Sequence, residues 1–485
     1  MNHRIQSGYL KIKRHPASPY LLLAAITLLA AALRFYRLGE WSFWIDEIYT
    51  IIRARSHFSD LETMLSFIPP SGCWVPLTTI LTAQAFNLLG VSEWSARLVS
   101  TLVGIITIPV LYLALKKIVG TPVALIAVLL LALSPWHIFW SQNARFYTAL
   151  LLFSTLALLA FYHAIENDRP GHLVLFYALF YFAMSERLIA GFILPVVAVY
   201  LLCIWVLPIP KPAGFRLRNI IVLALPVILF LVVQLYLFLT SGNLLFIEDA
   251  ETLPAAIDSP YRLLIVIAFS IGLPLALFAF FSGIQGLLTK DRAGLLFFIA
   301  ALLPVLLLAA ISPVVFTVER YAFHSLMFWV LLAATGIKQL FSIAGRQRVL
   351  LALAILFILL GDAAGEGLMY YQINRGNRLD WREAVAFVQQ HKQDEDVIVS
   401  SRWELAHHYS GEPIIDYQVI QPEDLKQIRQ PIWFIIDFPG VWHGSHESKR
   451  WIETHATMLQ YTYLRTREQN ALVVYYYDPR QGSAP

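Results

Sequence analysis

The chain has 485 residues, of which 58% are hydrophobic and only 14% are charged, and its formal net charge is +4. Ordinary soluble domains have about a quarter of their residues charged, so this composition excludes a water-soluble globular protein and indicates a polytopic membrane protein. Ordinary glycine (24) and proline (25) contents and only two cysteines also exclude collagen-like, disordered and disulfide-scaffold proteins.

A membrane span takes about 20 mostly apolar residues, and eleven apolar segments are candidates. They cover 19–36, 98–115, 121–139, 147–165, 172–185, 189–207, 220–240, 262–286, 293–311, 323–338 and 349–367. The first has a basic flank like a secretory signal, but no small-residue cleavage site follows it, so we expect an uncleaved span. We expect no disulfide, because Cys73 falls in an outer loop and Cys203 inside a span.

The segment 74–90 is apolar but short, and Gln84 and Asn87 interrupt it. It resembles an interfacial or re-entrant helix more than a crossing. If it does not cross and the N-terminus is cytoplasmic, all seven lysines before residue 368 lie inside. Counting it as a crossing would place Lys116 and Lys117 outside, against the positive-inside rule. We therefore expect a cytoplasmic N-terminus and an outer C-terminus. Because basic residues here report orientation, we expect no nucleic-acid partner.

The composition changes at about residue 368, which divides the chain into a transmembrane domain, 1–367, and a soluble domain, 368–485. The second part contains 12 Lys and Arg and 15 Asp and Glu in 118 residues. A helix-period stretch, DWREAVAFVQQH, precedes short apolar runs such as DVIVSS, PIWFIIDF and ALVVYYYD. This alternation predicts a small extracytoplasmic α/β domain.

The first outer loop, 37–97, is long for a membrane connection and begins with WSFWIDEIYTIIRAR. Its helical period places three residues on an apolar side: Ile48, Ile51 and Ile52. Four polar residues share the opposite side at helical spacing: Asp46, Tyr49, Thr50 and Arg53. A carboxylate beside a phenol and a guanidinium is suited to removing a proton from a hydroxyl near a phosphate. The alternative is that Asp46 and Glu47 only complement the positive end of this helix.

Arginine, but no lysine, is retained on the outer side of the predicted topology. The nine residues are Arg34, Arg37, Arg53, Arg55, Arg97, Arg145, Arg187, Arg262 and Arg320. The planar guanidinium grips carboxylate or phosphate in two places, so the set favours an anionic ligand. For any single arginine, ion pairing with outer acids or snorkelling at a helix end is the simpler explanation.

Three outer turns carry further polar candidates. SQNARFYT contributes Arg145 and Tyr147, SPVVFTVERYAFHS contributes Glu319, Arg320, Tyr321 and His324, and a third turn contributes Ser185, Glu186 and Arg187. Each set also suits ion pairs that cap a span. The sequence has no Walker-type loop, GxGxxG, GxSxG or HExxH motif, which disfavours nucleotide-driven transport and zinc proteolysis.

Several stretches, taken in order, resemble the GT-C glycosyltransferases. They are the acidic pair of the first loop, LLGVSEWSARLVSTLVGIITIPVLYLALKK, SPWHIFWSQNARFYTALLLFSTLALLAFY, ERYAFHSLMFW and DWREAVAF. Within that class the chain is most similar to family 39, which includes protein O-mannosyltransferases and lipid A aminoarabinose transferases. The sequence departs from the family pattern at two positions, and these departures bear on the type of acceptor and on the metal requirement. The loop helix begins WVPL instead of His-Pro-Pro-Leu, and no acid lies near Thr148.

The resemblance implies an inverting transfer of a sugar from a polyprenyl-phosphate carrier to a lipid, glycan or protein acceptor at the outer face of a bacterial inner membrane. It implies that Asp46 is the catalytic carboxylate and Glu47 its partner. Candidate residues for the carrier phosphate and the sugar are Tyr49, Arg53, Arg145, Tyr147, Arg187, Arg320, Tyr321 and His324. No cofactor is certain, and a divalent metal ion stays an open expectation. The C-terminal domain would then be periplasmic.

Two other classes of function fit part of the pattern. A transporter or flippase of lipid-linked sugars would share an apolar groove and outer basic residues. Transporters, however, tend to carry ionisable residues at mid-membrane and inverted repeats, and we find no repeat in this sequence. A non-catalytic assembly protein would also retain such a fold, although the Asp46–Glu47 pair argues against it.

Overall fold

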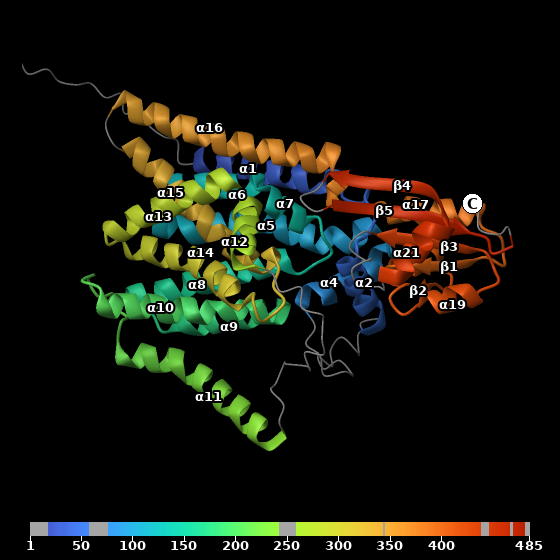
Figure 1. Cartoon of the computed structure of the whole chain (residues 1–485). Coiled ribbons are helices and arrows are strands. Elements are labelled where there is room, and N and C mark those ends of the chain that lie inside the picture. The colour runs from blue at the N-terminus through green and yellow to red at the C-terminus, as the bar shows by residue number, and fades with distance from the viewer. Residues whose placement is uncertain are drawn as a thin grey trace, which may run out of the picture.

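The computed structural model describes residues 18–57, 76–241, 259–342, 345–437, 446–465 and 469–480. A long helical bundle packs at one end against a small α/β domain (Figure 1). Helices α2 (Ile45–His57) and α4 (Leu77–Leu89) lie at the junction of the two parts.

The bundle consists of apolar helices that coincide with the predicted spans. They are α1 (Ser18–Phe35), α5 (Glu93–Val119), α6 (Thr121–Leu133), α7 (Pro135–Ser141), α8 (Tyr147–Asn167), α9 (Gly171–Glu186), η1 (Leu188–Phe192), α10 (Ile193–Val206), α11 (Leu217–Ser241), α12 (Pro260–Ile271), α13 (Leu273–Leu288), α14 (Arg292–Ile311), η2 (Glu319–Ser325), α15 (Leu326–Ser342) and α16 (Arg346–Leu368). Within the described ranges, eight helices are long and apolar enough to cross a membrane, or up to ten if each of two bent pairs is one span. The chain is therefore a multi-pass membrane protein, with slightly fewer complete spans than the eleven expected.

Two of the predicted spans are broken rather than straight, and α9 has only 16 residues. Helices α6 and α7 meet at 62° and α12 and α13 at 99°. The first break precedes Pro135, which has no backbone N–H to continue the hydrogen-bond ladder. The second break is at Gly272, whose φ of 98° is a conformation that side chains disfavour. Hydropathy alone measures the apolar length and does not detect such bends.

Helix α4 has 13 residues, about 20 Å at 1.5 Å per residue, which is too short for a bilayer core of about 30 Å. This agrees with the expectation that the segment 74–90 forms a helix without crossing. Cys203 is a free thiol in α10. Cys73, and the rest of 58–75, lie outside the described residues.

The C-terminal domain is built on a five-stranded sheet, as the alternating sequence pattern predicted. Its strands are β1 (Val397–Ser400), β2 (Ile415–Asp416), β3 (Ile432–Asp437), β4 (Thr457–Arg465) and β5 (Gln469–Tyr477), in the order β2-β1-β3-β5-β4. Strands β2, β1 and β3 are parallel, whereas β5 runs antiparallel to both β3 and β4. In the described part of the domain, four helices accompany the sheet: α17 (Trp381–His391), α18 (Trp403–Ser410), α19 (Pro422–Gln427) and α21 (His446–His455).

One face of this sheet shares its hydrophobic core with the first loop of the bundle. Ile48 and Ile51 of α2 are each 1% exposed and belong to the same cluster as Trp381, Leu405 and Trp433. The third residue of the predicted apolar side, Ile52, is exposed instead. Helix α2 is thus fixed between the bundle and the domain.

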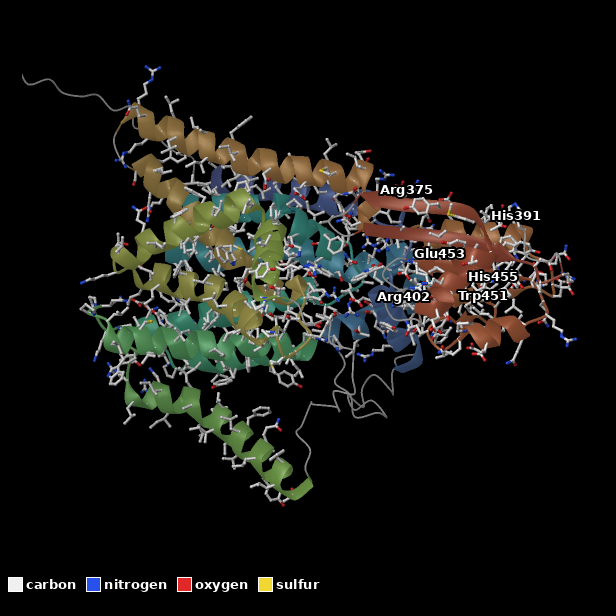
Figure 2. The ribbon with its side chains drawn as sticks, in the orientation of Figure 1. Arg375, His391, Arg402, Trp451, Glu453 and His455 are labelled. Atoms are coloured by element: carbon white, nitrogen blue, oxygen red, sulfur yellow. The ribbon has the colours of Figure 1, made fainter. Side chains whose placement is uncertain are left out.

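The chain enters the domain through a short π-helix, η3 (Met369–Ile373), and a single turn, η4 (Arg375–Asn377). Arg375 lies where α16 ends and the domain begins, whereas Trp451 and His455 of α21 lie within the domain (Figure 2). In that helix the Trp451 and His455 rings stack with their centroids 4.7 Å apart.

Candidate active site

Asp46 lies in the first turn of α2 beside two guanidinium groups. Its Oδ2 is 3.5 Å from Nη2 of Arg320 and 4.0 Å from Nη2 of Arg145. The Asp46 side chain is 19% exposed. A carboxylate and two cations from three separate segments therefore converge at the end of the bundle that faces the α/β domain.

Arg145 also holds the backbone of α2. Its Nη1 donates to the carbonyl oxygen of Asp46 at 2.9 Å and to Oγ1 of Thr50 at 3.2 Å. Its guanidinium lies over the Phe146 ring, 4.9 Å from the centroid. The turn between α7 and α8 carries Arg145, and Oγ of Ser100 donates to its carbonyl oxygen at 2.7 Å. Arg145 is therefore anchored at both its backbone and its side chain.

Arg320 comes from η2, the turn that precedes α15. It contacts the Asp46 carboxylate and the Trp44 ring, whose centroid is 5.7 Å from the guanidinium carbon, and it interacts electrostatically with Tyr147, Glu319 and Tyr321. With its side chain 23% exposed, it is less enclosed than Arg145 at 14%. Of these two arginines, Arg320 is thus the more accessible to a ligand.

Arg187 and two tyrosines extend the cluster. Arg187 is exposed, and its guanidinium lies 5.7 Å from the Phe146 ring centroid and 6.0 Å from that of Tyr321. Tyr147 is buried, its ring 4.0 Å from that of Trp140, and it is close enough to Arg320, Arg145 and Asp46 for their charges to act on it. Aromatic faces therefore surround the guanidinium groups on the bundle side.

Three predicted ligand residues lie apart from this cluster. The Tyr49 hydroxyl donates to Oε1 of Glu404 in the α/β domain at 3.3 Å, and burial together with Glu404 raises the pKa of Tyr49. Arg53 is exposed two helical turns beyond Asp46, about 10 Å along the axis. His324 pairs its Nδ1 with the Tyr321 carbonyl oxygen at 3.0 Å, and its buried Nε2 has no hydrogen-bond partner among the described residues. Four residues were predicted to form the polar side of α2, and two of them, Asp46 and Thr50, contact Arg145.

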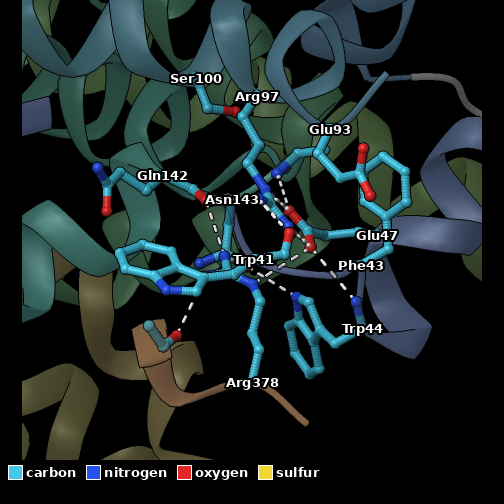
Figure 3. Close-up of polar contacts among 12 residues, drawn as sticks. Trp41, Phe43, Trp44, Glu47, Glu93, Arg97, Ser100, Gln142, Asn143 and Arg378 are labelled. Atoms are coloured by element: carbon cyan, nitrogen blue, oxygen red, sulfur yellow. Dashed lines mark hydrogen bonds and ion pairs between the residues drawn. The ribbon is translucent and has the colours of Figure 1, made fainter. Parts of the chain in front are cut away.

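Glu47, the residue after Asp46, points into a closed polar pocket (Figure 3). Its side chain is 0% exposed, and Arg97 donates to both carboxylate oxygens, at 2.8 and 2.9 Å. The backbone N–H of Ala144 donates at 2.9 Å, and Nε of Arg378 lies 3.4 Å away. Burial opposes the charge, but Arg97 and Arg378 outweigh it and lower the pKa of Glu47 to about 2.

Glu47 is therefore enclosed by protein groups, whereas Asp46 is partly exposed; the role of Glu47 as the catalytic partner of Asp46, which the resemblance implied, stays a prediction. The pocket completes the packing between α2, α5 and the turn after α7. Arg97 comes from α5, and Ser92 caps the N-terminus of this helix by accepting from the N–H of Ser95 at 3.2 Å. Arg97 also donates to the carbonyl oxygens of the loop before α2: Leu38, Trp41 and Ser42.

Glu186, from the third predicted turn, likewise fixes an element. Its carboxylate accepts from the backbone N–H of Thr78 at 3.2 Å and from its Oγ1 at 2.7 Å. Thr78 lies in the first turn of α4, where free N–H groups favour an anion. Glu186 thus joins α9 to α4 directly before the exposed Arg187.

The position expected to carry an acid in some relatives holds Thr148, which is buried and donates to the Ser100 carbonyl oxygen at 3.3 Å. No three His, Cys, Asp or Glu side chains within the described parts of the chain converge to hold a metal ion.

Sequence reasoning left the two partners of Glu47 unassigned. Arg97 was one of nine outer arginines and had no distinguishing signal, because 50 residues separate it from Glu47. Arg378 directly precedes the DWREAVAF stretch, and its position there was the only local indication.

Comparisons with known proteins agree with this architecture. The family described as dolichyl-phosphate-mannose-protein mannosyltransferase matches residues 75–236. No curated protein matches the chain.

Three solved structures are similar to the chain over most of its length. ArnT from Cupriavidus metallidurans bound to undecaprenyl phosphate has a TM-score of 0.58 at 16% identity, covering 95% of this chain and 98% of that one. Its apo state has a TM-score of 0.56 at 15% identity, covering 94% and 98%. The archaeal oligosaccharyltransferase AglB from Archaeoglobus fulgidus, in complex with an inhibitory peptide and a dolichol-phosphate, has a TM-score of 0.57 at 12% identity, covering 94% and 74%. The chain therefore has the GT-C fold of these enzymes and resembles the protein O-mannosyltransferase and ArnT group of GT-C glycosyltransferases.

Proposed function

We propose that this protein transfers a sugar from a polyprenyl-phosphate donor to an acceptor hydroxyl or amine. The observation that carries the proposal is the Asp46 carboxylate within 4.0 Å of Arg145 and 3.5 Å of Arg320. This arrangement offers a proton acceptor and cations for a phosphate in one place. The undecaprenyl phosphate of the ArnT structure and the dolichol-phosphate of the AglB structure support a lipid-phosphate donor.

The proposed reaction is a single displacement with inversion. The acceptor oxygen or nitrogen forms a bond to the anomeric carbon as the bond from that carbon to the phosphate oxygen breaks. The prenyl phosphate leaves with the bonding electron pair, and the acceptor proton passes to Asp46. Arg320 and Arg187 neutralise the charge that develops on the leaving phosphate.

This geometry requires a rearrangement when the donor binds. In an inverting displacement the base and the leaving group act on opposite faces of the sugar, so the sugar ring must lie between Asp46 and the phosphate. Arg145 is tied to the α2 backbone, whereas the Arg320 guanidinium lies against the Asp46 carboxylate and the Trp44 ring. We therefore assign phosphate binding to Arg320 and helix anchoring to Arg145.

We further propose that the site faces the periplasm of a bacterial inner membrane. Helix α5 has 27 residues; it begins at Glu93, near Arg97 at the site, and carries Lys116 and Lys117 in its last turn. These lysines are about 35 Å from the site end of the helix. The positive-inside rule places the lysine end in the cytoplasm, which supports an outer location for Asp46 and for the C-terminal domain.

The test is to incubate the purified protein in nanodiscs with a panel of prenyl-phosphate sugars and total membrane acceptors, and to measure release of the carrier phosphate. We expect release from at least one donor, and none above background with Asp46→Asn. Repeating the assay with EDTA determines whether a divalent ion takes part. Intact donors that are moved between leaflets without carrier release would overturn transfer and favour a flippase.

A further inference from the structure

The start of the C-terminal domain contributes a buried cation to the pocket beside the proposed catalytic residue. Arg378 follows η4, its side chain is 1% exposed, and its Nε lies 3.4 Å from Oε2 of Glu47 (Figure 3). Its Nη2 donates to the carbonyl oxygen of Gln142 at 2.7 Å. The guanidinium also lies over two rings, at 5.9 Å from the Trp41 centroid and 5.7 Å from that of Phe139.

Arg378 is a second cation beside a carboxylate that already has a counter-ion. Arg97 already pairs with both oxygens of Glu47, at 2.8 and 2.9 Å, and forms a neutral buried pair. Removing another guanidinium from water costs several kcal/mol before its contacts offset the penalty. A net positive charge in a closed pocket therefore indicates a role other than neutralisation.

The backbone that delivers Arg378 is itself unusual. Arg375, Gly376 and Asn377 have φ values of 46°, 66° and 56°, so three consecutive residues are left-handed. A Cβ at Gly376 would lie 2.4 Å from a ring carbon of Trp41. Left-handed conformations cost free energy for residues other than glycine, and they persist where the surroundings impose them. The tight turn places Arg378 against Glu47 at the expense of local strain.

We propose that Arg378 is a positioning residue, which holds Glu47 and thereby sets the first turn of α2 so that Asp46 faces the substrate. The proposal rests on the function proposed above for Asp46. Asp46 and Glu47 are consecutive in one helical turn, so a shift of Glu47 moves the Asp46 backbone with it. The C-terminal domain consequently completes the active site through the junction rather than only covering it.

Further contacts between the domain and the segment before α2 also help to fix the position of the first turn of α2. The Tyr409 hydroxyl accepts from the backbone N–H of Phe43 at 2.7 Å and donates to Glu93 at 3.0 Å. The Ser42 hydroxyl donates to Oδ1 of Asp380 at 3.0 Å. Among these contacts, Arg378 is the one that reaches the carboxylate pair directly.

The experiment compares Arg378→Met and Arg378→Lys with a control, Arg375→Met. Arg375 lies in the same turn, but its side chain is 52% exposed and pairs with Asp380 and Glu383 of the domain itself. We expect Arg378→Met to lower kcat by about 10- to 100-fold, as a displacement near 1 Å does, with donor KM changed by less than about threefold. Arg378→Lys should recover part of kcat, and Arg375→Met should resemble the wild type.

A second measurement, independent of turnover, keeps the two proposals apart. Hydrogen exchange of the α2 backbone amides should accelerate in Arg378→Met and not in Arg375→Met. Unchanged exchange together with an unchanged kcat would overturn the positioning role even if the wild type transfers sugar. Faster exchange in a protein without transferase activity would instead overturn the proposed function. A fall in kcat matched by an equal rise in donor KM in Arg378→Met would also overturn the positioning role.

Discussion

The two sides of the first turn of α2 differ in what surrounds their carboxylates. Asp46 is partly exposed, and its cations lie at 3.5 and 4.0 Å, which is loose for an ion pair. Glu47 is fully enclosed, with both oxygens bonded to Arg97 at 2.8 and 2.9 Å and a backbone N–H at 2.9 Å. The two adjacent acids thus differ in their surroundings: Asp46 is accessible to a ligand, whereas Glu47 is enclosed and pairs with residues of the protein itself.

The difference between Asp46 and Glu47 shows how a site at the end of a bundle can be held rigid and still stay accessible to a substrate. A fully satisfied buried carboxylate rigidifies its surroundings and has no capacity left for a substrate. An incompletely paired carboxylate keeps that capacity. The four predictions below test the contrast by perturbing one side at a time.

The largest effect on activity should follow from Asp46→Asn. The substitution keeps the shape of the side chain and removes the proton acceptor, so turnover should fall by about 10²- to 10⁴-fold. The measurement is the initial rate of carrier-phosphate release at saturating donor. The free energy of unfolding should change by less than about 1 kcal/mol, because the ion pairs of Asp46 are loose and partly exposed.

Glu404→Gln provides a matched carboxylate control, since Glu404 contacts α2 through Tyr49 on the domain side. Its turnover should stay near that of the wild type. Full activity in Asp46→Asn would mean that another residue takes the acceptor proton.

The largest effect on stability should follow from Glu47→Gln. An uncharged amide leaves Arg97 and Arg378 buried without a counter-ion, and breaking a buried pair in this way costs about 3–5 kcal/mol. The thermal unfolding midpoint in detergent should fall clearly, whereas Glu40→Gln should change it little, because Glu40 pairs with Arg37 at the surface. An unchanged midpoint in Glu47→Gln would show that the closed pocket does not stabilise the fold.

Arg320→Met should affect the donor more than the fold. Losing a hydrogen bond to a charged phosphate costs about 1.5–3 kcal/mol, so donor KM should rise by about 10- to 100-fold. Arg187→Met should have a smaller effect, because Arg187 is exposed and contacts ring faces. The measurement is the dependence of the initial rate on donor concentration. Equal KM values for the wild type and Arg320→Met would remove Arg320 from the phosphate site.

Much of the fold could be predicted from the sequence because its main signals are local. Apolar length gave the positions of the spans, and alternating patterns gave α17, β1, β3 and β5. The bends at Pro135 and Gly272 were not predicted, since a hydropathy window averages over a break. In the site, Asp46, Arg145 and Arg320 were candidates, but segments so far apart in the chain meet only through packing.

The division of labour within the acidic pair was beyond the sequence for a different reason. Helical periodicity distinguishes the directions of Asp46 and Glu47, but it does not show which direction is closed. That depends on Arg97 from α5 and Arg378 from the domain, whose side chains reach Glu47 by tertiary packing. Tyr49 illustrates the same limit, because Glu404 of the domain binds it away from the arginine cluster.

The smallest predicted effect is a pH dependence of stability that arises from Glu47. The pKa of Glu47 is about 2 in the folded protein, against an ordinary value of 4.5. A lowered carboxyl pKa stabilises the folded state fully above the ordinary value and loses that contribution as the pH falls towards the folded value. The stability difference between the wild type and Glu47→Gln should therefore be constant from pH 5 to 8. Below about pH 4.5 it should shrink by about 1 kcal/mol per pH unit.

Unfolding midpoints of both proteins, measured at intervals from pH 3 to 8, test this dependence. A difference that already shrinks between pH 7 and 6 would mean that Glu47 takes up a proton near neutrality. Burial would then outweigh the two guanidinium groups, and the first turn of α2 would be held by packing rather than by charge. Arg378 would in that case have no ionised carboxylate to hold, so the same titration also tests the link from the C-terminal domain to Asp46.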